Sequence, residues 1–149
     1  MLAVRALHVL AMALVLGGAT LTWWLFRQVR GASATPTESA AAAFSVAAAY
    51  ERGFWAAMGV LVMTGVGNLG SLAPYVPAAE TEWGTAFAVK LALVLGVLAL
   101  SLVRTLVVAR YRRVESARGR GLRTLRLGYG ATALSLAALV ALAEVLAHG

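Results

Sequence analysis

Residues 84–108 read GTAFAVKLALVLGVLALSLVRTLVV and decide the fold class of this chain. Within this apolar stretch the only charged side chains are Lys90 and Arg104. A helix of about 20 mostly apolar residues can cross a hydrocarbon core of about 30 Å, so the stretch is long enough to span a bilayer. We expect an all-α fold, a four-helix transmembrane bundle that forms one domain over residues 1–149. The other three predicted spans are residues 2–26, 53–69 and 127–147.

The composition of the whole chain agrees with a membrane protein. Of its 149 residues, 61% are hydrophobic and 13% are charged, and the mean hydropathy is +0.82. There is no cysteine and no aspartate, so disulfides and thiolate metal sites are excluded. The sequence also lacks GxSxG, phosphate-loop and HExxH motifs, which argues against a hydrolase of those classes. Whether the chain is an enzyme stays open.

The basic residues predict the orientation of the bundle. Eight of the thirteen lie between Arg104 and Arg126. A cluster of arginines beside a span is typical of a cytoplasmic loop that contacts anionic lipid, and we favour this interpretation over nucleic-acid binding. Arg27 and Arg30 make the first connector basic, whereas residues 70–83 contain no Lys or Arg. We therefore expect both connectors in the cytoplasm and both termini on the extracytoplasmic side of the cytoplasmic (inner) membrane.

The second helix is expected to begin near Pro36, because proline favours the first turn of a helix. Its alanine-rich first part, through Glu51 and Arg52, is expected at or below the membrane surface. Aromatic residues are enriched at membrane interfaces, so an inner aromatic belt is predicted at Tyr50, Phe54, Trp55, Tyr111 and Tyr129. Close helix contacts are predicted at Gly17, Gly18, Gly59, Gly65 and Gly67.

Four ionisable residues of the predicted spans are expected in the outer third of the bilayer: Arg5, His8, Lys90 and Glu144. Charged groups at membrane depth are costly, about 2.5 to 3.5 kcal/mol for Arg or Lys at the centre, so each needs an explanation. One hypothesis is a shared polar site, open to the extracytoplasmic side, in which Lys90 pairs with Glu144. The alternative is that Arg5, His8 and His148 reach to the interface while Lys90 and Glu144 only neutralise one another.

His8 is the strongest ligand candidate in this cluster, because imidazole binds both transition metals and haem iron. Met12 follows it by four residues, which places a thioether sulfur on the same helix face. Glu144 and His148 have the same spacing in the last span. The candidate metal ligands are therefore His8, Met12, Glu144 and His148.

Three stretches carry a resemblance to a known family. They are Leu61-Val62-Met63-Thr64-Gly65-Val66, Trp83-Gly84-Thr85-Ala86-Phe87-Ala88-Val89-Lys90-Leu91-Ala92-Leu93-Val94, and the arginine-rich turn after them. In these the chain resembles the CopD family of bacterial copper-resistance membrane proteins. The resemblance implies that the chain handles copper or transports it across the cytoplasmic membrane. His8 and Met12 would then be ligands, Glu144 and His148 an entrance pair, and Lys90 a structural or gating charge.

The four-span plan, with His8 early in the first span and Lys90 early in the third, also resembles HemJ, a haem-containing protoporphyrinogen oxidase. This resemblance implies a b-type haem protein or oxidoreductase subunit. His8 would be the axial ligand, and Arg5 or Lys90 would lie near the haem propionates.

A third interpretation involves no ligand. The chain would be an accessory structural subunit of a membrane complex, and its loop between Arg104 and Arg126 would face lipid, a membrane protein partner or a second copy of the chain. These three alternatives stay open at the level of the sequence.

Overall fold

The computed structural model describes residues 2–29, 36–72, 80–113 and 118–148, and its side chains except those at 36–37, 68–72, 113, 118–120 and 145–148. These residues form four helices, which confirms the all-α expectation. Each of the four predicted spans lies inside one helix. In chain order the helices are α1 (Leu2–Gln28), α2 (Pro36–Leu72), α3 (Glu82–Arg113) and α4 (Arg118–His148).

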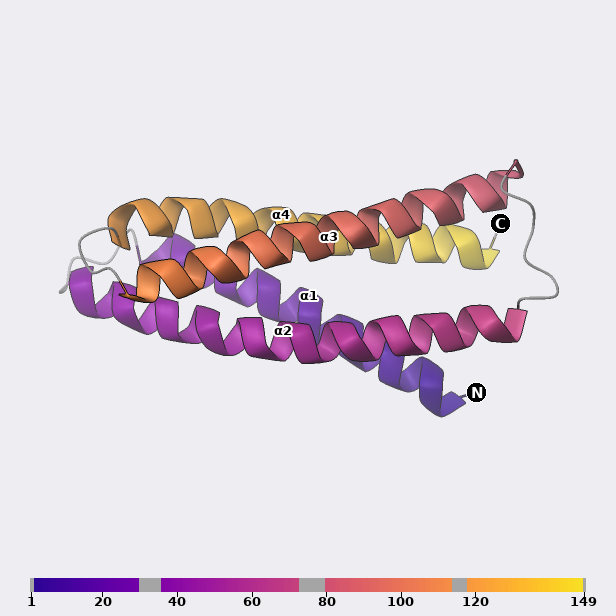
Figure 1. Ribbon diagram of the computed structural model, residues 1–149, viewed down its shortest axis with the longest axis horizontal. Coiled ribbons are helices and arrows are strands. Elements are labelled where there is room, and N and C mark those ends of the chain that lie inside the picture. Colours follow the sequence, from indigo (N-terminus) through magenta and orange to yellow (C-terminus); the bar gives the residue numbers. More distant parts are fainter. Residues whose placement is uncertain (1, 30–35, 73–79, 114–117, 149) are drawn as a thin grey trace.

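The helices run side by side along one long axis, and each points opposite to the one before it in sequence (Figure 1). The start of α1 and the end of α4 lie at the same end of the bundle, which we call the terminal end. The end of α1 and the start of α4 lie at the other, which we call the arginine end. An even number of antiparallel helices thus returns the end of α4 to the end of the bundle at which α1 begins.

Local sequence explains where two of the helices begin. Helix α2 begins at Pro36, as predicted. Helix α3 begins after Thr81, whose side-chain oxygen accepts a hydrogen bond of 3.1 Å from the backbone nitrogen of Gly84. This N-cap satisfies one of the donors that the first turn of a helix leaves without a partner.

Two apolar clusters form the interior of the bundle. The terminal apolar cluster fills the middle and terminal part with Ala11, Val15, Ala19, Phe54, Met58, Leu61, Val97, Leu136 and Leu139. The arginine-end apolar cluster contains Phe26, Ala43, Phe44, Ala47, Ala48, Val108, Leu125 and Tyr129. Helix α1 packs extensively on α2 and α4, and α3 packs on α4, whereas α2 and α3 contact each other much less.

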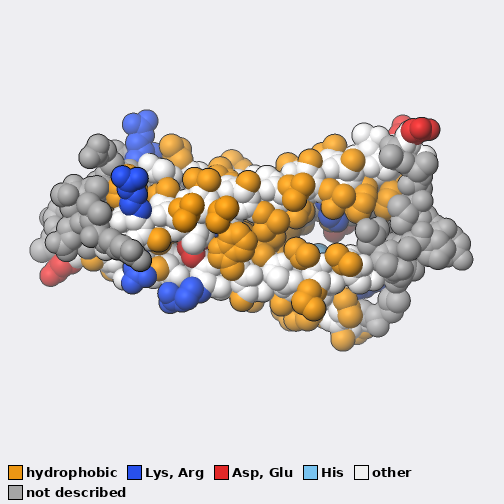
Figure 2. Space-filling model, viewed as in Figure 1, with side chains coloured by type: hydrophobic (Ala, Val, Ile, Leu, Met, Phe, Trp, Pro, Cys, Tyr) orange, Lys and Arg blue, Asp and Glu red, His pale blue; other side chains and the backbone are white. Residues whose placement is uncertain are grey.

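The outer surface of the bundle is apolar on every helix. Leu14, Met63, Leu95 and Leu134 are exposed examples from α1 to α4, and hydrophobic side chains cover the middle of the face in Figure 2. Among the described residues, three segments are long and apolar enough to cross a membrane: Leu2–Gln28, Glu82–Arg112 and Gly121–Glu144. Contiguous apolar surface of this extent suits contact with lipid rather than water.

One of the predicted glycine contacts is essential to the packing. A Cβ atom at Gly18 would lie 2.5 Å from the ring of Tyr50, so α1 accepts this ring only because residue 18 lacks a side chain. The prediction is wrong for Gly17, Gly59 and Gly67, where a Cβ atom would meet nothing within 4 Å.

Candidate functional site

A polar contact joins α1 to α2 in the terminal half of the bundle. The Nδ1 atom of His8 lies 2.7 Å from Oγ1 of Thr64. When the Thr64 hydroxyl donates its single proton to the carbonyl oxygen of Val60, 2.7 Å away, its oxygen can accept a hydrogen bond from the imidazole. In that arrangement, Nδ1 of the neutral ring carries the proton and Nε2 keeps a free lone pair. A histidine held in this way is prepared to bind a metal through Nε2.

Lys90 from α3 belongs to the same region. Its side chain is partly buried. Toward the terminal end, the surface in Figure 2 is hollowed between α2 and α3, and basic, acidic and histidine side chains show inside the hollow. That His8 and Lys90 share one polar site stays a prediction.

The other predicted site residues differ in their exposure. Arg5 is exposed on α1, and Glu144 is exposed on α4. The pairing of Glu144 with Lys90 stays a prediction. Met12 packs against the terminal apolar cluster and is partly buried. The side chain of His148 lies outside the described residues.

A closed cage of hard ligands is absent from the described part of the chain, where no three His, Asp or Glu side chains gather to hold a metal ion. The side chains of α1 that could donate to a metal ion in this region are those of His8, through nitrogen, and Met12, through sulfur. Nitrogen and thioether donors suit Cu(I) better than Mg²⁺ or Ca²⁺, which prefer oxygen.

A second polar cluster, which the sequence analysis missed, lies buried toward the arginine end. Arg104 of α3 and Glu51 of α2 are 3% and 4% exposed. The guanidinium donates from Nε to Oε1 at 2.6 Å and from Nη2 to Oε2 at 3.3 Å. This two-point geometry is the strongest arrangement that an arginine can make with a carboxylate.

Hydroxyl groups complete this ion pair. Tyr129 of α4 donates to Oε1 of Glu51 at 2.6 Å, and Thr105 of α3 donates to Oε2 at 2.6 Å. Thr132 of α4 accepts a hydrogen bond from Nη1 of Arg104. We call these five residues the Glu51–Arg104 network. Because both carboxylate oxygens and all three guanidinium nitrogens have partners, the network can remain charged away from water.

Three aromatic rings surround the guanidinium carbon of Arg104. It lies 4.6 Å from the ring centre of Tyr129, 4.9 Å from that of Phe54 and 5.3 Å from that of Tyr50. Cations over aromatic faces gain more when water is excluded. The Tyr50 hydroxyl also donates to the carbonyl oxygen of Val15 at 2.9 Å, which links α1 to the same level of the bundle.

The network corrects one sequence prediction. Tyr129 and Phe54 are buried rather than part of an interfacial aromatic belt. Glu51 is buried inside the bundle, because the alanine-rich first part of α2 packs against α1, α3 and α4. The sequence contains one signal that Arg104 is buried. It lies within the predicted span 84–108 and is followed by apolar residues.

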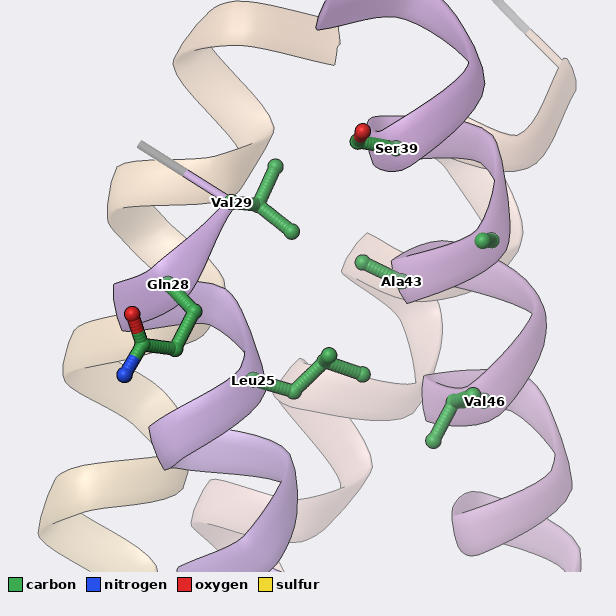
Figure 3. Close-up of a pocket in the computed structure, with 7 residues that line it drawn as sticks. Leu25, Gln28, Val29, Ser39, Ala43 and Val46 are labelled. Carbon is green, nitrogen blue, oxygen red and sulfur yellow. The ribbon is translucent and has the colours of Figure 1, made fainter. Parts of the chain in front are cut away.

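A shallow groove of about 300 Å³ lies at the arginine end between the last turn of α1 and the start of α2. Figure 3 shows Leu25 and Val29 of α1 opposite Ser39, Ala43 and Val46 of α2. Its lining includes no charged or metal-binding side chain. The groove is therefore separate from both polar clusters.

Comparison with known proteins gave one match. Residues 44–146 match the model of the family described as CopD, copper resistance protein D. The matched range includes Thr64, Lys90, Glu144 and the Glu51–Arg104 network, whereas α1 with His8 lies outside it. Searches of curated proteins and of solved structures found no match. The match confirms the resemblance seen in the sequence, and with the three candidate spans it supports a multi-pass membrane protein related to copper resistance.

Proposed function

The chain belongs to the CopD family, and from that premise we propose that it takes a copper ion at the terminal end of the bundle and passes it into or through the membrane. The observation that carries the proposal is the hydrogen bond between His8 and Thr64. Because this bond engages Nδ1, we propose that a copper ion binds through Nε2 of His8, in a part of the bundle that is hollowed between α2 and α3.

The proposed ligand set is soft. His8 supplies a nitrogen, and Met12, one helical turn later, supplies a sulfur. Cu(I) accepts two or three such ligands. Because α1 lies outside the range that matches the family, the roles of His8 and Met12 rest on the geometry of this chain alone.

Charge balance assigns a part to Lys90 and Glu144. In this proposal the copper ion at His8 is near the ammonium group of Lys90, and like charges at short distance disfavour each other. A carboxylate beside them offsets that repulsion. We therefore propose that Glu144, with His148 at the end of α4, attracts the ion at the entrance and neutralises Lys90.

The orientation follows from the basic residues. We propose that the arginine end lies in the cytoplasm and the terminal end on the outer side of the cytoplasmic membrane, with α2 as the fourth span. The arginines between Arg104 and Arg126 would contact anionic lipid headgroups, except for Arg104 itself, which the buried network holds.

Metal analysis of the purified protein tests the proposal. We expect bound Cu(I) in the native chain and its loss in His8→Ala, with reduced copper tolerance or uptake in cells that carry the variant. Arg27→Ala, at an exposed position of the arginine end, is the control and should keep copper. If His8→Ala leaves copper content and tolerance unchanged, the proposal is wrong. A Soret band in the visible spectrum that His8→Ala abolishes would identify haem instead.

A further inference from the structure

The hydrogen bonds between α2 and α3 concentrate at one level of the bundle. Glu51 bonds to Arg104 and Thr105, and Trp55 donates from Nε1 to the Thr105 hydroxyl at 3.0 Å. Toward the terminal end the same two helices separate in Figure 1. The bundle is thus closed between α2 and α3 on the arginine side and hollowed on the terminal side.

An ion pair is an unusual way to close this contact. Removing two charges from water costs much of what their attraction returns, and well-packed apolar residues often hold helices at least as tightly. The best-supported use of a buried ion pair is to specify one arrangement or to permit a change between two. In this bundle, apolar clusters already lie on both sides of the network.

Ser101 adds an independent observation at the same level. Its side chain is 0% exposed, and its hydroxyl oxygen has no hydrogen-bond partner. It lies one helical turn before Thr105, on the terminal side of Arg104. A buried hydroxyl without a partner has a free-energy cost that water would remove. The closed arrangement therefore leaves the Ser101 hydroxyl without a hydrogen bond that water could supply in a more open one.

We propose that the Glu51–Arg104 network is a gate that closes the arginine side of the bundle, and that its opening separates α2 from α3 and admits water as far as Ser101. Separated from each other, Glu51 and Arg104 would both be hydrated, so opening exchanges one set of partners for another. This inference rests on the proposed passage of copper, for which the gate would release the ion on the arginine side.

The chain contains no cysteine, so a single introduced thiol reports water access without a background signal. We choose Ser101→Cys, because it replaces one small buried side chain by another. A membrane-impermeant thiol reagent is added to sealed vesicles of both orientations, without copper. Arg110→Cys, at an exposed position of α3 toward the arginine end, is the accessible control for that side, and Glu82→Cys, at the exposed start of α3, is the control for the terminal side. Each should react equally fast in every background.

The expected rates have a definite order. In the native background Ser101→Cys reacts slowly, and only from the arginine side, because the gate opens rarely. Glu51→Gln leaves Arg104 as an unpaired buried charge and should raise the rate about tenfold or more. Glu51→Gln with Arg104→Met closes the contact with neutral groups and should lower the rate to about a tenth of the native value or less.

Two outcomes would overturn the gate. Equal rates in the native and doubly neutral backgrounds mean that the network is only structural, and faster labelling from the terminal side means that the opening lies elsewhere. If Glu51→Gln does not fold, Arg104→Lys, which keeps the charge but not the two-point geometry, should give the raised rate. Because the labelling uses no copper, its result is independent of whether His8 binds the ion.

Discussion

In the arginine half of the bundle, Glu51 and Arg104 are almost fully buried and have hydrogen-bond partners from three helices, whereas in the terminal half His8 and Lys90 are only partly buried. His8 has a hydrogen bond on one nitrogen and leaves the other free. A cluster whose donors and acceptors all have partners can hold helices together or, when it breaks, let them separate. It cannot bind a ligand unless some of its hydrogen bonds break. A cluster with an unused nitrogen beside a hollow can bind one.

The difference also shows that membrane depth alone does not identify a ligand site. Both clusters contain charged groups that cost free energy in hydrocarbon. What separates them is the number of partners around each group, and this number depends on contacts between helices. The following experiments test this contrast, in order of decreasing effect on stability.

The largest loss is expected for Arg104→Met. The variant leaves the Glu51 carboxylate buried without its cation, and breaking such a pair costs about 3–5 kcal/mol. Unfolding of the purified protein in detergent by urea or heat measures the loss. Arg110→Met, at an exposed position two turns later, is the matched control and should change stability by less than about 0.5 kcal/mol. Equal stability of the two variants would contradict the buried network.

Tyr129→Phe should have the next largest effect. It removes the hydroxyl that donates to Oε1 of Glu51 at 2.6 Å, while the ring remains over Arg104. A hydrogen bond to a charged group contributes about 1.5–3 kcal/mol. Tyr111→Phe, on the arginine side of the network, serves as the control for the same chemical change. If both substitutions lower the unfolding midpoint equally, the Tyr129 hydroxyl has no special part in the network.

Gly18→Val and Gly17→Val form a matched pair one residue apart. The first introduces atoms where even a Cβ would lie 2.5 Å from the Tyr50 ring, so α1 and α2 must move apart, at a cost of about 1–3 kcal/mol. The second faces open space and should be tolerated. Thermal unfolding in detergent distinguishes them. Similar midpoints for both variants would mean that Tyr50 does not pack on Gly18.

The smallest effect on stability is expected for Thr64→Val, which changes the terminal half. The valine keeps the shape of the side chain but cannot accept the proton of His8 Nδ1, so the imidazole loses its fixed orientation. Loss of such a supporting partner reduces metal affinity about 10–100-fold. Competition with a Cu(I) chelator measures the affinity. Thr20→Val is the control, because the Thr20 hydroxyl donates to the carbonyl oxygen of Leu16 within α1. Equal Cu(I) affinities of the Thr64→Val and Thr20→Val variants would mean that Thr64 does not support the site.

Several features of this protein follow from the sequence alone. A continuous apolar run such as residues 84–108 forms a helix in a membrane, because a helix satisfies its backbone donors and acceptors within the segment. The four helices, the start of α2 at Pro36 and the placement of both termini at one end are all predictable on this basis.

Other features were decided only by tertiary structure. Glu51 stands beside the basic Arg52, and Arg104 begins the arginine-rich part of the chain, so in sequence both look like surface charges. They become a buried pair because Gly18 admits Tyr50, the alanines of α2 bring the helices close, and Tyr129 and Thr132 arrive from α4. Periodicity shows which face of a helix is apolar, but which residues meet across helices depends on rotation, depth and side-chain volume together. Those quantities exist only in the assembled bundle.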